Sequence, residues 1–149
     1  MFTGSYTGNI DDKGRVVIPM KLRLSLGERI CICKGVDGCL NVFTQDAWNE
    51  YKDSYISNRT HEDEKARRLH RLVFGGAQEL EIDRQGRINL PLELKEFAKI
   101  KKDVTVIGCG NFIEIWSAEA YRKEAEAING EMQALMSNAA KITAAASVD

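Results

Sequence analysis

The sequence has little proline, little histidine and no long apolar run, and each shortage excludes a class of protein. Two prolines in 149 residues, beside 44% hydrophobic residues, are not the composition of a disordered or collagen-like chain. No stretch approaches the roughly 18 apolar residues that a membrane-spanning helix needs. The opening MFTGSYTG has neither the basic nor the apolar region of a signal peptide. We therefore expect a globular cytoplasmic protein without a membrane partner.

The chain also has no excess of charge of either sign. It carries 21 basic and 22 acidic residues, which leaves a net charge of −1. A protein with this balance that binds nucleic acid must gather its positive charge on one face, because the phosphate backbone attracts a locally basic surface. Composition therefore sets a condition for nucleic-acid binding without indicating it.

Cysteine and histidine do not form a recognisable metal-binding or catalytic motif. Cys31, Cys33 and Cys39 lie in the apolar segment ICICKGVDGC, Cys109 lies alone, and the two histidines are nine positions apart. Structural zinc sites use CxxC-type pairs with a matching second pair, and a nucleophilic cysteine needs a base placed to activate it. We interpret the cysteines as reduced core residues, with a metal site as the lesser alternative. We expect no catalytic residue, no metal and no cofactor.

The chain contains an internal duplication. The sequence IDDKGRVVIP at residues 10–19 returns as IDRQGRINLP at residues 82–91, which is 72 positions later. A second block, LNVFTQDAW at residues 40–48, matches IEIWSAEAY at residues 113–121 with an offset of 73. Two aligned blocks at nearly constant spacing predict two homologous halves, and one residue has been gained between the blocks.

The first half, residues 1–58, predicts short strands with one short helix among them. Asp11 and Gly14 have the properties of a tight turn, in which glycine supplies a positive φ. Pro19 is suited to opening a helix over residues 20–26. The predicted strands, marked by alternation and β-forming residues, cover residues 5–10, 15–18, 30–33 and 40–43.

The second half, residues 77–125, repeats this scheme. Pro91 is expected to open a helix with Leu94 and Phe97 facing inward, and Ser117 to cap a helix that begins at Ala118. The predicted strands cover residues 80–82, 87–90, 104–108 and 112–116. Because each half alone leaves exposed strand edges, we expect the two halves to pair into one closed barrel.

Three further segments read as helices. In the first half, Thr44 or Asp46 should cap a helix that carries Trp48, Tyr51 and Tyr55 on one side. We expect these three aromatic residues, and Trp116 of the second half, to pack in the core rather than stack on bases. Residues 59–76 form a middle helix and linker, with a helix over residues 59–73 that has acid early and base late. Residues 126–149 form a helical tail with an amphipathic spacing of Ile128, Met132, Leu135 and Met136 and an end expected to fray.

The doubled pattern D-x-x-G-R-x-x-x-P, together with RRLHRLVFGGA before its second copy, resembles the MraZ family. The likeness covers essentially residues 1–125. The wider group is the AbrB-like (SpoVT-AbrB) swapped-hairpin superfamily, whose members carry one copy per chain and dimerise. A chain of the MraZ type carries both copies.

This resemblance implies a mainly β fold with helices, namely a double-psi β-barrel formed by two tandem AbrB-like halves. It implies a sequence-specific DNA-binding transcriptional regulator rather than an enzyme. Its partner would be double-stranded DNA, at promoter repeats ahead of the division and cell-wall gene cluster. The resemblance further implies a ring-shaped homo-oligomer that associates with the nucleoid.

The duplicated motif supplies the candidate site. Residues 13–29 and residues 84–102 each carry a net charge of +4, which meets the condition set by composition. Arginine suits DNA because its planar fork grips two acceptors at once. The candidate DNA-binding residues are Arg15, Arg87, Lys13, Arg84, Lys21 and Arg23. The loop scaffold is assigned to Asp11, Gly14, Pro19, Asp83, Gly86 and Pro91.

Several alternatives stay open. The motif arginines have a structural interpretation, in which each pairs with the aspartate four residues earlier and holds the turn together. Asp12, where many relatives are neutral, is expected to weaken the contact of the first loop with phosphate. The basic run Lys65, Arg67, Arg68 and Arg71 is interpreted as a solvated face that pairs with Glu62 and Glu64. The rival functions are an assembly scaffold that does not bind DNA and, less favoured, an enzyme on a double-psi barrel.

Overall fold

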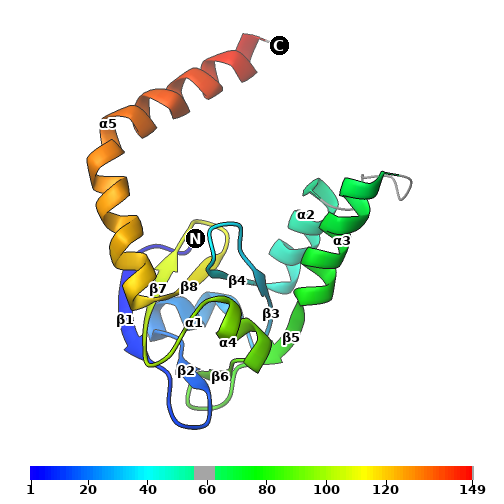
Figure 1. The fold of residues 1–149 in the computed structure, drawn as a ribbon, viewed down its shortest axis with the longest axis vertical. Helices are drawn as coiled ribbons and strands as arrows, with labels where there is room; N and C mark the ends of the chain where they lie inside the picture. Colours follow the sequence, from blue (N-terminus) through cyan, green and yellow to red (C-terminus); the bar gives the residue numbers. More distant parts are fainter. Residues whose placement is uncertain (56–62, 149) are drawn as a thin grey trace. The chain divides into compact units, whose positions relative to one another are not determined.

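The strands of the two halves are interleaved within one sheet, so neither half forms a separate body (Figure 1). The computed structural model describes residues 1–55 and 63–148, except the side chains of residue 55 and residues 145–148. Two compact units are distinguished, Met1–Ala118 and Glu119–Asp149. The first unit contains all the described strands and both copies of the motif.

The duplication seen in the sequence is present in the order of elements. The first half contains β1 (Ser5–Asn9), β2 (Arg15–Val17), α1 (Met20–Leu26), β3 (Arg29–Lys34), β4 (Leu40–Phe43) and α2 (Gln45–Tyr55). After α3 (Glu64–Gly76), the second half contains β5 (Gln78–Glu81), β6 (Arg87–Asn89), α4 (Leu92–Phe97), β7 (Asp103–Gly108), β8 (Ile113–Ser117) and α5 (Ala118–Val148). Each predicted strand is found, and every end lies within two residues of the prediction.

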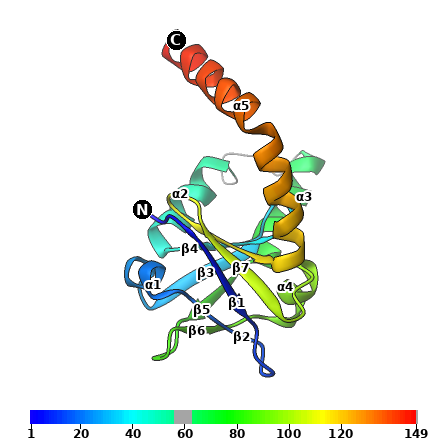
Figure 2. The same cartoon turned by 90° about the vertical axis from the view of Figure 1, so that its left-hand side faces the viewer.

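The larger sheet has six strands in the order β1-β7-β8-β4-β3-β5, and every neighbouring pair is antiparallel. Three of its contacts join the two halves. Gly8 of β1 lies opposite Val104 of β7, Leu40 of β4 opposite Ile115 of β8, and Cys31 of β3 opposite Glu79 of β5. The strands that precede each hairpin loop, β1 and β5, therefore each pair with β7 or β3 of the other half (Figure 2).

A second sheet consists only of β2 and β6, with Val16 opposite Ile88. The hydrogen bonds that continue it also cross between the halves. The Ile18 N–H donates to the Gly86 carbonyl at 2.8 Å, and the Leu90 N–H donates to the Gly14 carbonyl at 2.9 Å. Each hairpin loop is thus held by the strand end of the other half.

These sheets confirm a mainly β class with helices. The described ladders do not form one closed circuit, because the larger sheet ends at β1 and β5 and meets the smaller one through an isolated bridge between Ile10 and Val16. The closed double-psi barrel expected from the sequence therefore stays a prediction.

One apolar core fills the space between the two sheets. Val16 and Ile88 of the smaller sheet are fully buried, as are Ile32 and Ile115 of the larger sheet. Pro19 and Pro91 precede α1 and α4 with extended backbone, and each helix turns a leucine, Leu22 or Leu94, into the core. Phe97 is partly buried against the same core. Gly27 ends α1 with a φ of 81°, as predicted.

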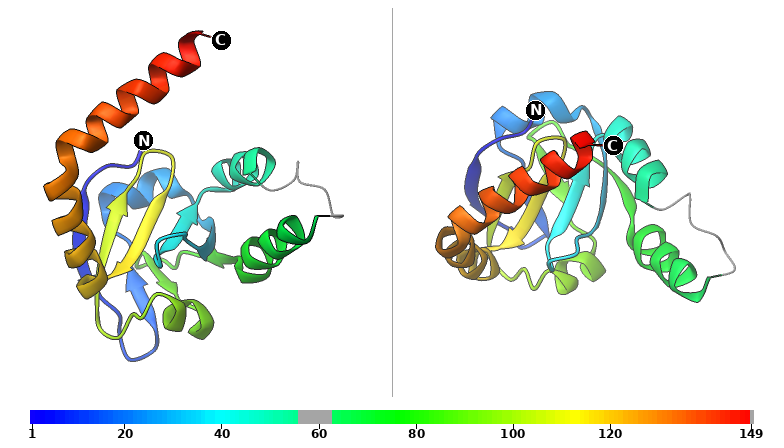
Figure 3. Two further views of the ribbon diagram at one scale, coloured as in Figure 1. Left: turned by 45° about the horizontal axis from the view of Figure 1, so that its top comes forward. Right: turned by 90° about the horizontal axis from the view of Figure 1, so that it is seen from above.

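The helices α2 and α3 pack against β3 and lie next to each other (Figure 3). Thr44, rather than Asp46, caps α2, because its Oγ1 accepts from the Ala47 N–H at 3.1 Å. The helix α3 runs past its predicted end to Gly76, so its last turn holds no basic residue and the expected acid-early, base-late order is wrong at that end. The predicted start, residues 59–62, lies outside the described residues.

The second unit is almost entirely α5, which begins at Ala118 as predicted. The helix continues to Val148, and the fraying expected at its end stays a prediction. None of the helices in the described residues combines the length and the apolar character that crossing a membrane requires.

Residues 2–4 pass close to Gly108 at the end of β7, and this contact can be tested by substitution. Gly108 donates its N–H to the Gly4 carbonyl at 2.9 Å, and a Cβ at position 108 would overlap the backbone of Phe2 and Thr3. We expect Gly108→Ala to lower the free energy of unfolding by about 1–3 kcal/mol, because backbone must shift to make room. Urea denaturation at one fixed protein concentration measures the change.

Gly75 is the matched control for this substitution. It lies in the last turn of α3, and a Cβ there meets nothing within 4 Å. Gly75→Ala should leave stability unchanged or raise it by up to about 1 kcal/mol. Equal effects of the two substitutions would contradict the predicted overlap at Gly108.

Candidate nucleic-acid interface

The first hairpin loop is organised around the carboxylate of Asp11. Its Oδ1 accepts the main-chain N–H groups of Lys13 and Arg15, both at 2.9 Å, and its Oδ2 accepts Nε of Arg15 at 2.8 Å. The Gly14 N–H donates to the Asp11 carbonyl at 3.0 Å, with Gly14 at a φ of 81°. One aspartate therefore holds both the turn and the arginine.

The second loop repeats this geometry almost without change. Asp83 accepts the N–H groups of Gln85 and Arg87 at 2.9 Å and Nε of Arg87 at 2.8 Å. Gly86 has a φ of 78°, in the left-handed region that favours glycine. In both loops the aspartate accepts main-chain N–H groups of the turn and the glycine has a positive φ.

Each motif arginine is bound to its aspartate, which is the structural interpretation left open above. The pairing uses only Nε, and no hydrogen bond from the Nη atoms of Arg15 or Arg87 is found to any described residue. Since a guanidinium has five N–H donors, four remain for another acceptor. Side-chain exposures of 28% and 25% leave both groups accessible to solvent. The ion pair therefore orients the guanidinium group and leaves its Nη donors available to bind another acceptor.

The pairing of β2 with β6 places both arginines on one face. Arg15 lies opposite Asn89, and Val17 lies opposite Arg87, so these four side chains share the face away from buried Val16. Arg15 and Arg87 are diagonal neighbours on this ribbon, and such neighbours lie about 7–8 Å apart. Both hairpin loops project at the same end of the first unit, the lower end in Figures 1 and 2.

The remaining candidate residues divide into two groups. Lys13 and Arg84 are exposed in the loops, and Lys21 is exposed on α1. Arg23, by contrast, has a buried Nε without a hydrogen-bond partner in the described residues, and a Cβ at Gly86 would overlap its guanidinium. The structure therefore places the Arg23 side chain against Gly86 of the second loop.

A basic pair that the site prediction omitted lies beside the first loop. The Ile10 N–H donates to the Lys102 carbonyl at 2.7 Å, which places exposed Lys101 and Lys102 at the base of that hairpin. The equivalent bond beside the second loop runs from the Ile82 N–H to the Glu28 carbonyl at 2.8 Å, and the next residue, Arg29, binds Glu81 at 3.0 Å. The signal in the sequence that points to the lysine pair is the net charge of +4 over residues 84–102, which includes both lysines.

The other features of the chain do not add to this interface. Cys31, Cys33 and Cys39 are buried and free, and desolvation raises the pKa of Cys31 to about 11 and that of Cys33 to about 12, so both thiols are protonated at neutral pH. Cys109 is half-buried and also free. In the part of the chain that the structure describes, no three His, Cys, Asp or Glu side chains are grouped to hold a metal.

The aromatic residues pack together, as predicted for core residues. Phe43 stacks on Tyr51 at 4.9 Å and on Phe112 at 5.4 Å, and its ring centroid lies 5.8 Å from that of Trp48. Trp116 is buried, whereas the side chain of Tyr55 lies outside what the structure describes.

The basic run on α3 has one described ion pair, between Arg68 and Glu64 at 2.8 Å. This pair supports the interpretation of the run as a solvated face. Glu62, the other expected partner, lies outside the described residues.

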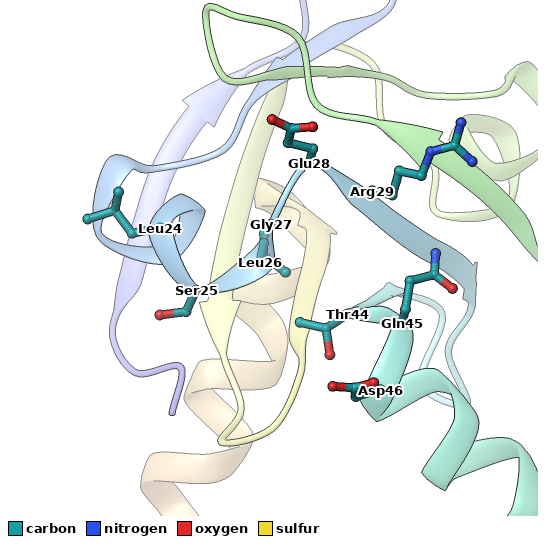
Figure 4. A pocket seen from close by; sticks show the side chains of 9 residues that line it. All are labelled: Leu24, Ser25, Leu26, Gly27, Glu28, Arg29, Thr44, Gln45 and Asp46. Atoms are coloured by element: carbon teal, nitrogen blue, oxygen red, sulfur yellow. The ribbon is translucent and has the colours of Figure 1, made fainter.

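An open depression lies between the end of α1, the start of β3 and the start of α2 (Figure 4). Glu28 and Asp46 bring two carboxylates to its lining, against the single guanidinium of Arg29. Because carboxylates repel phosphate, this depression is not a candidate for nucleic acid.

The chain matches the model of a known protein family. The family model described as "MraZ protein, putative antitoxin-like" matches residues 1–71 and again residues 73–141. The model therefore matches the chain twice in tandem, and each matched segment contains one copy of the hairpin motif.

The loop geometry predicts how the aspartates titrate. The Arg15 N–H bound to Asp11, and then the Arg15 side chain, hold the pKa of that carboxyl below its ordinary value of 3.8, and Arg87 does the same for Asp83. A lowered pKa means that the stabilisation is complete above about pH 4 and is lost as pH falls through the folded-state pKa. Carboxyl NMR titration should find both groups below 3.8.

Arg15→Ala separates the two causes. It removes the side-chain pair but keeps the main-chain N–H, so the pKa of Asp11 should rise only part of the way to its ordinary value. Asp83 in the same sample is the internal control and should not move. An Asp11 that titrates at its ordinary value in the unaltered chain would show that the loop is not closed as described.

Proposed function

The chain belongs to the MraZ family, and on this premise we propose that it is a DNA-binding transcriptional regulator that contacts double-stranded DNA with its two hairpin loops. The family is described as antitoxin-like. That description and the doubled AbrB-like motif both favour a regulator over an enzyme.

The observation that carries the proposal is the exposed face of the β2–β6 ribbon. It presents two guanidinium groups, Arg15 and Arg87, each oriented by an aspartate with its Nη atoms available. A two-stranded ribbon fits the major groove of B-DNA, and a guanidinium can bind the guanine edge or a phosphate. Pre-oriented side chains lose less conformational entropy on binding than mobile ones.

The charges around the ribbon support the same face. Lys13 and Arg84 lie in the two loops, Lys21 is exposed on α1, and Lys101 and Lys102 flank the first loop. These residues gather the positive charge that a chain with a net charge of −1 needs to attract phosphate.

Two hairpin loops offer only a small contact area with DNA, so a single chain is expected to bind weakly. We infer that several chains assemble into a ring-shaped homo-oligomer and engage several short DNA repeats together, since linked weak contacts multiply through effective concentration. Bending of the DNA along the ring would match the spacing of the loops to that of the repeats. The proposed targets are tandem promoter repeats ahead of the division and cell-wall gene cluster, which places the protein at the nucleoid in the cytoplasm. The proposed core of each chain is a double-psi barrel.

Substitution of the motif arginines tests this proposal. Arg15→Ala should abolish specific binding, and Arg87→Ala should weaken it, because each lost arginine contact costs about 1–3 kcal/mol and the loss is repeated in every subunit. Arg68→Ala is the matched control, because Arg68 is an exposed, ion-paired arginine on α3, outside the hairpins. Gel shift measures binding, and size-exclusion chromatography checks that assembly is intact.

The DNA for this test comes from selection out of random sequence with the purified protein, which should yield short repeats at constant spacing. Binding by the unaltered chain should fall steeply as salt rises, since phosphate neutralisation releases counterions. Unchanged binding in Arg15→Ala would reject the site. A protein that shifts no DNA and is indifferent to salt would instead be an assembly scaffold.

A further inference from the structure

The C-terminal helix α5 carries an apolar stripe that nothing in the proposed function uses. Glu126 to Ala144 are exposed along their whole length, including Ile128 at 39%, Leu135 at 45% and Ile142 at 62%. Long helices in water depend on packing of an apolar face for most of their stability. Gly130 in the middle of α5 lowers its intrinsic stability further. We therefore expect another apolar surface to pack against the stripe and stabilise α5.

The spacing of the stripe identifies the kind of partner. Its positions alternate in steps of three and four: Ala125, Ile128, Met132, Leu135, Ala139 and Ile142. The same spacing continues in the sequence to Tyr121 and Ala146. A repeat of 3.5 residues stays on one side of a helix only when the helix winds around another helix. A helix packed on a sheet or globular surface would show the wider 3.6-residue face instead.

We propose that α5 pairs with α5 of a second copy of this chain as an antiparallel two-helix coiled coil. The stripe is complementary to itself when the helices run in opposite directions about a two-fold axis between Gln133 and Ala134. Ile128 then faces Ala139, and Ile142 faces Ala125, so a large side chain meets a small one. Met132 meets Leu135 at the centre, and Met136, 67% exposed, borders the stripe. The six positions pair only with one another, as a two-fold contact requires.

The charges of α5 favour the antiparallel direction. Its first part, residues 118–131, contains four glutamates against Arg122 and Lys123, whereas Lys141 is the one charged residue of residues 132–148. A parallel pair would place the two acidic parts side by side. The antiparallel pair places each acidic part along a part that is neutral or basic, and it also opposes the two helix dipoles.

Disulfide trapping in the full chain tests the pairing. Two variants, Ile128→Cys and Ala139→Cys, are co-expressed with different tags, mildly oxidised and run on a non-reducing gel beside the unaltered chain. The antiparallel register brings position 128 of one copy against position 139 of the other, so a covalent heterodimer should form. Either variant alone should form at most a tenth as much, because its two cysteines lie eleven residues, or about 16 Å, apart along the pair.

Ile128→Cys with Ser137→Cys is the control pair, since Ser137 lies on the face away from the stripe. Adding Leu135→Asp to the trapping pair should lower the yield of the covalent heterodimer at least tenfold, whereas adding Ser137→Asp should leave the yield unchanged. Leu135 is exposed, and circular dichroism verifies that the first unit of each variant stays folded. Arg15→Ala should leave the trapped dimer unchanged, so a failure of the DNA-binding proposal does not obscure this result.

Two outcomes overturn the inference. A strong homodimer of Ile128→Cys alone would show parallel pairing or random collision. No heterodimer from the trapping pair, with folding intact, would show that α5 does not pair in this register.

Discussion

The structure depends on the exchange of main-chain hydrogen bonds between the two hairpins. The Ile18 N–H binds the Gly86 carbonyl, and the Leu90 N–H binds the Gly14 carbonyl. Neither half can satisfy these groups by itself, since its own loop is held by the other half. An unpaired buried peptide group costs about as much as a lost hydrogen bond, so one half alone would expose both its strand edges and its core. The same exchange, through the pairing of β2 with β6, places Arg15 and Arg87 on one face of the ribbon.

The Asp–Arg pair within each loop acts on the loop and on the arginine at once. By accepting two main-chain N–H groups, Asp11 stabilises the turn that Gly14 makes possible, and by accepting Nε it fixes the direction of the guanidinium. The two interpretations of the motif arginine, turn support and external contact, are therefore compatible. A surface ion pair of this kind adds little to stability on its own, and its effect lies in orienting a group that must desolvate to bind.

The sequence alone predicted the local elements well, because their signals are local. The repeated motif marks each strand, turn and helix start of both halves, and Pro19 and Gly27 bound α1 as the structure has it. Sequence patterning does not state which strand pairs with which, so the crossing of β1 to β7 and of β5 to β3 was not predicted. The position of Arg23 against Gly86 was missed for the same reason, since the two residues are more than sixty positions apart. The end of α3 was also missed, since the helix continues past the predicted residue 73 to Gly76.

Fusion of the two copies in one chain has freed them to differ, and the differences give the ribbon a direction. The first loop has Asp12 and lies beside Lys101 and Lys102, whereas the second has Arg84 and lies against Arg23. A dimer of identical single-copy chains presents two equal loops, and its symmetry matches palindromic half-sites. Unequal loops have no such symmetry, so in the proposed function each chain would distinguish the two orientations of a short DNA site. The proposed ring of directional units would match repeats that all point the same way, and for this reason the asymmetry of the loops favours tandem repeats over palindromes as the proposed target.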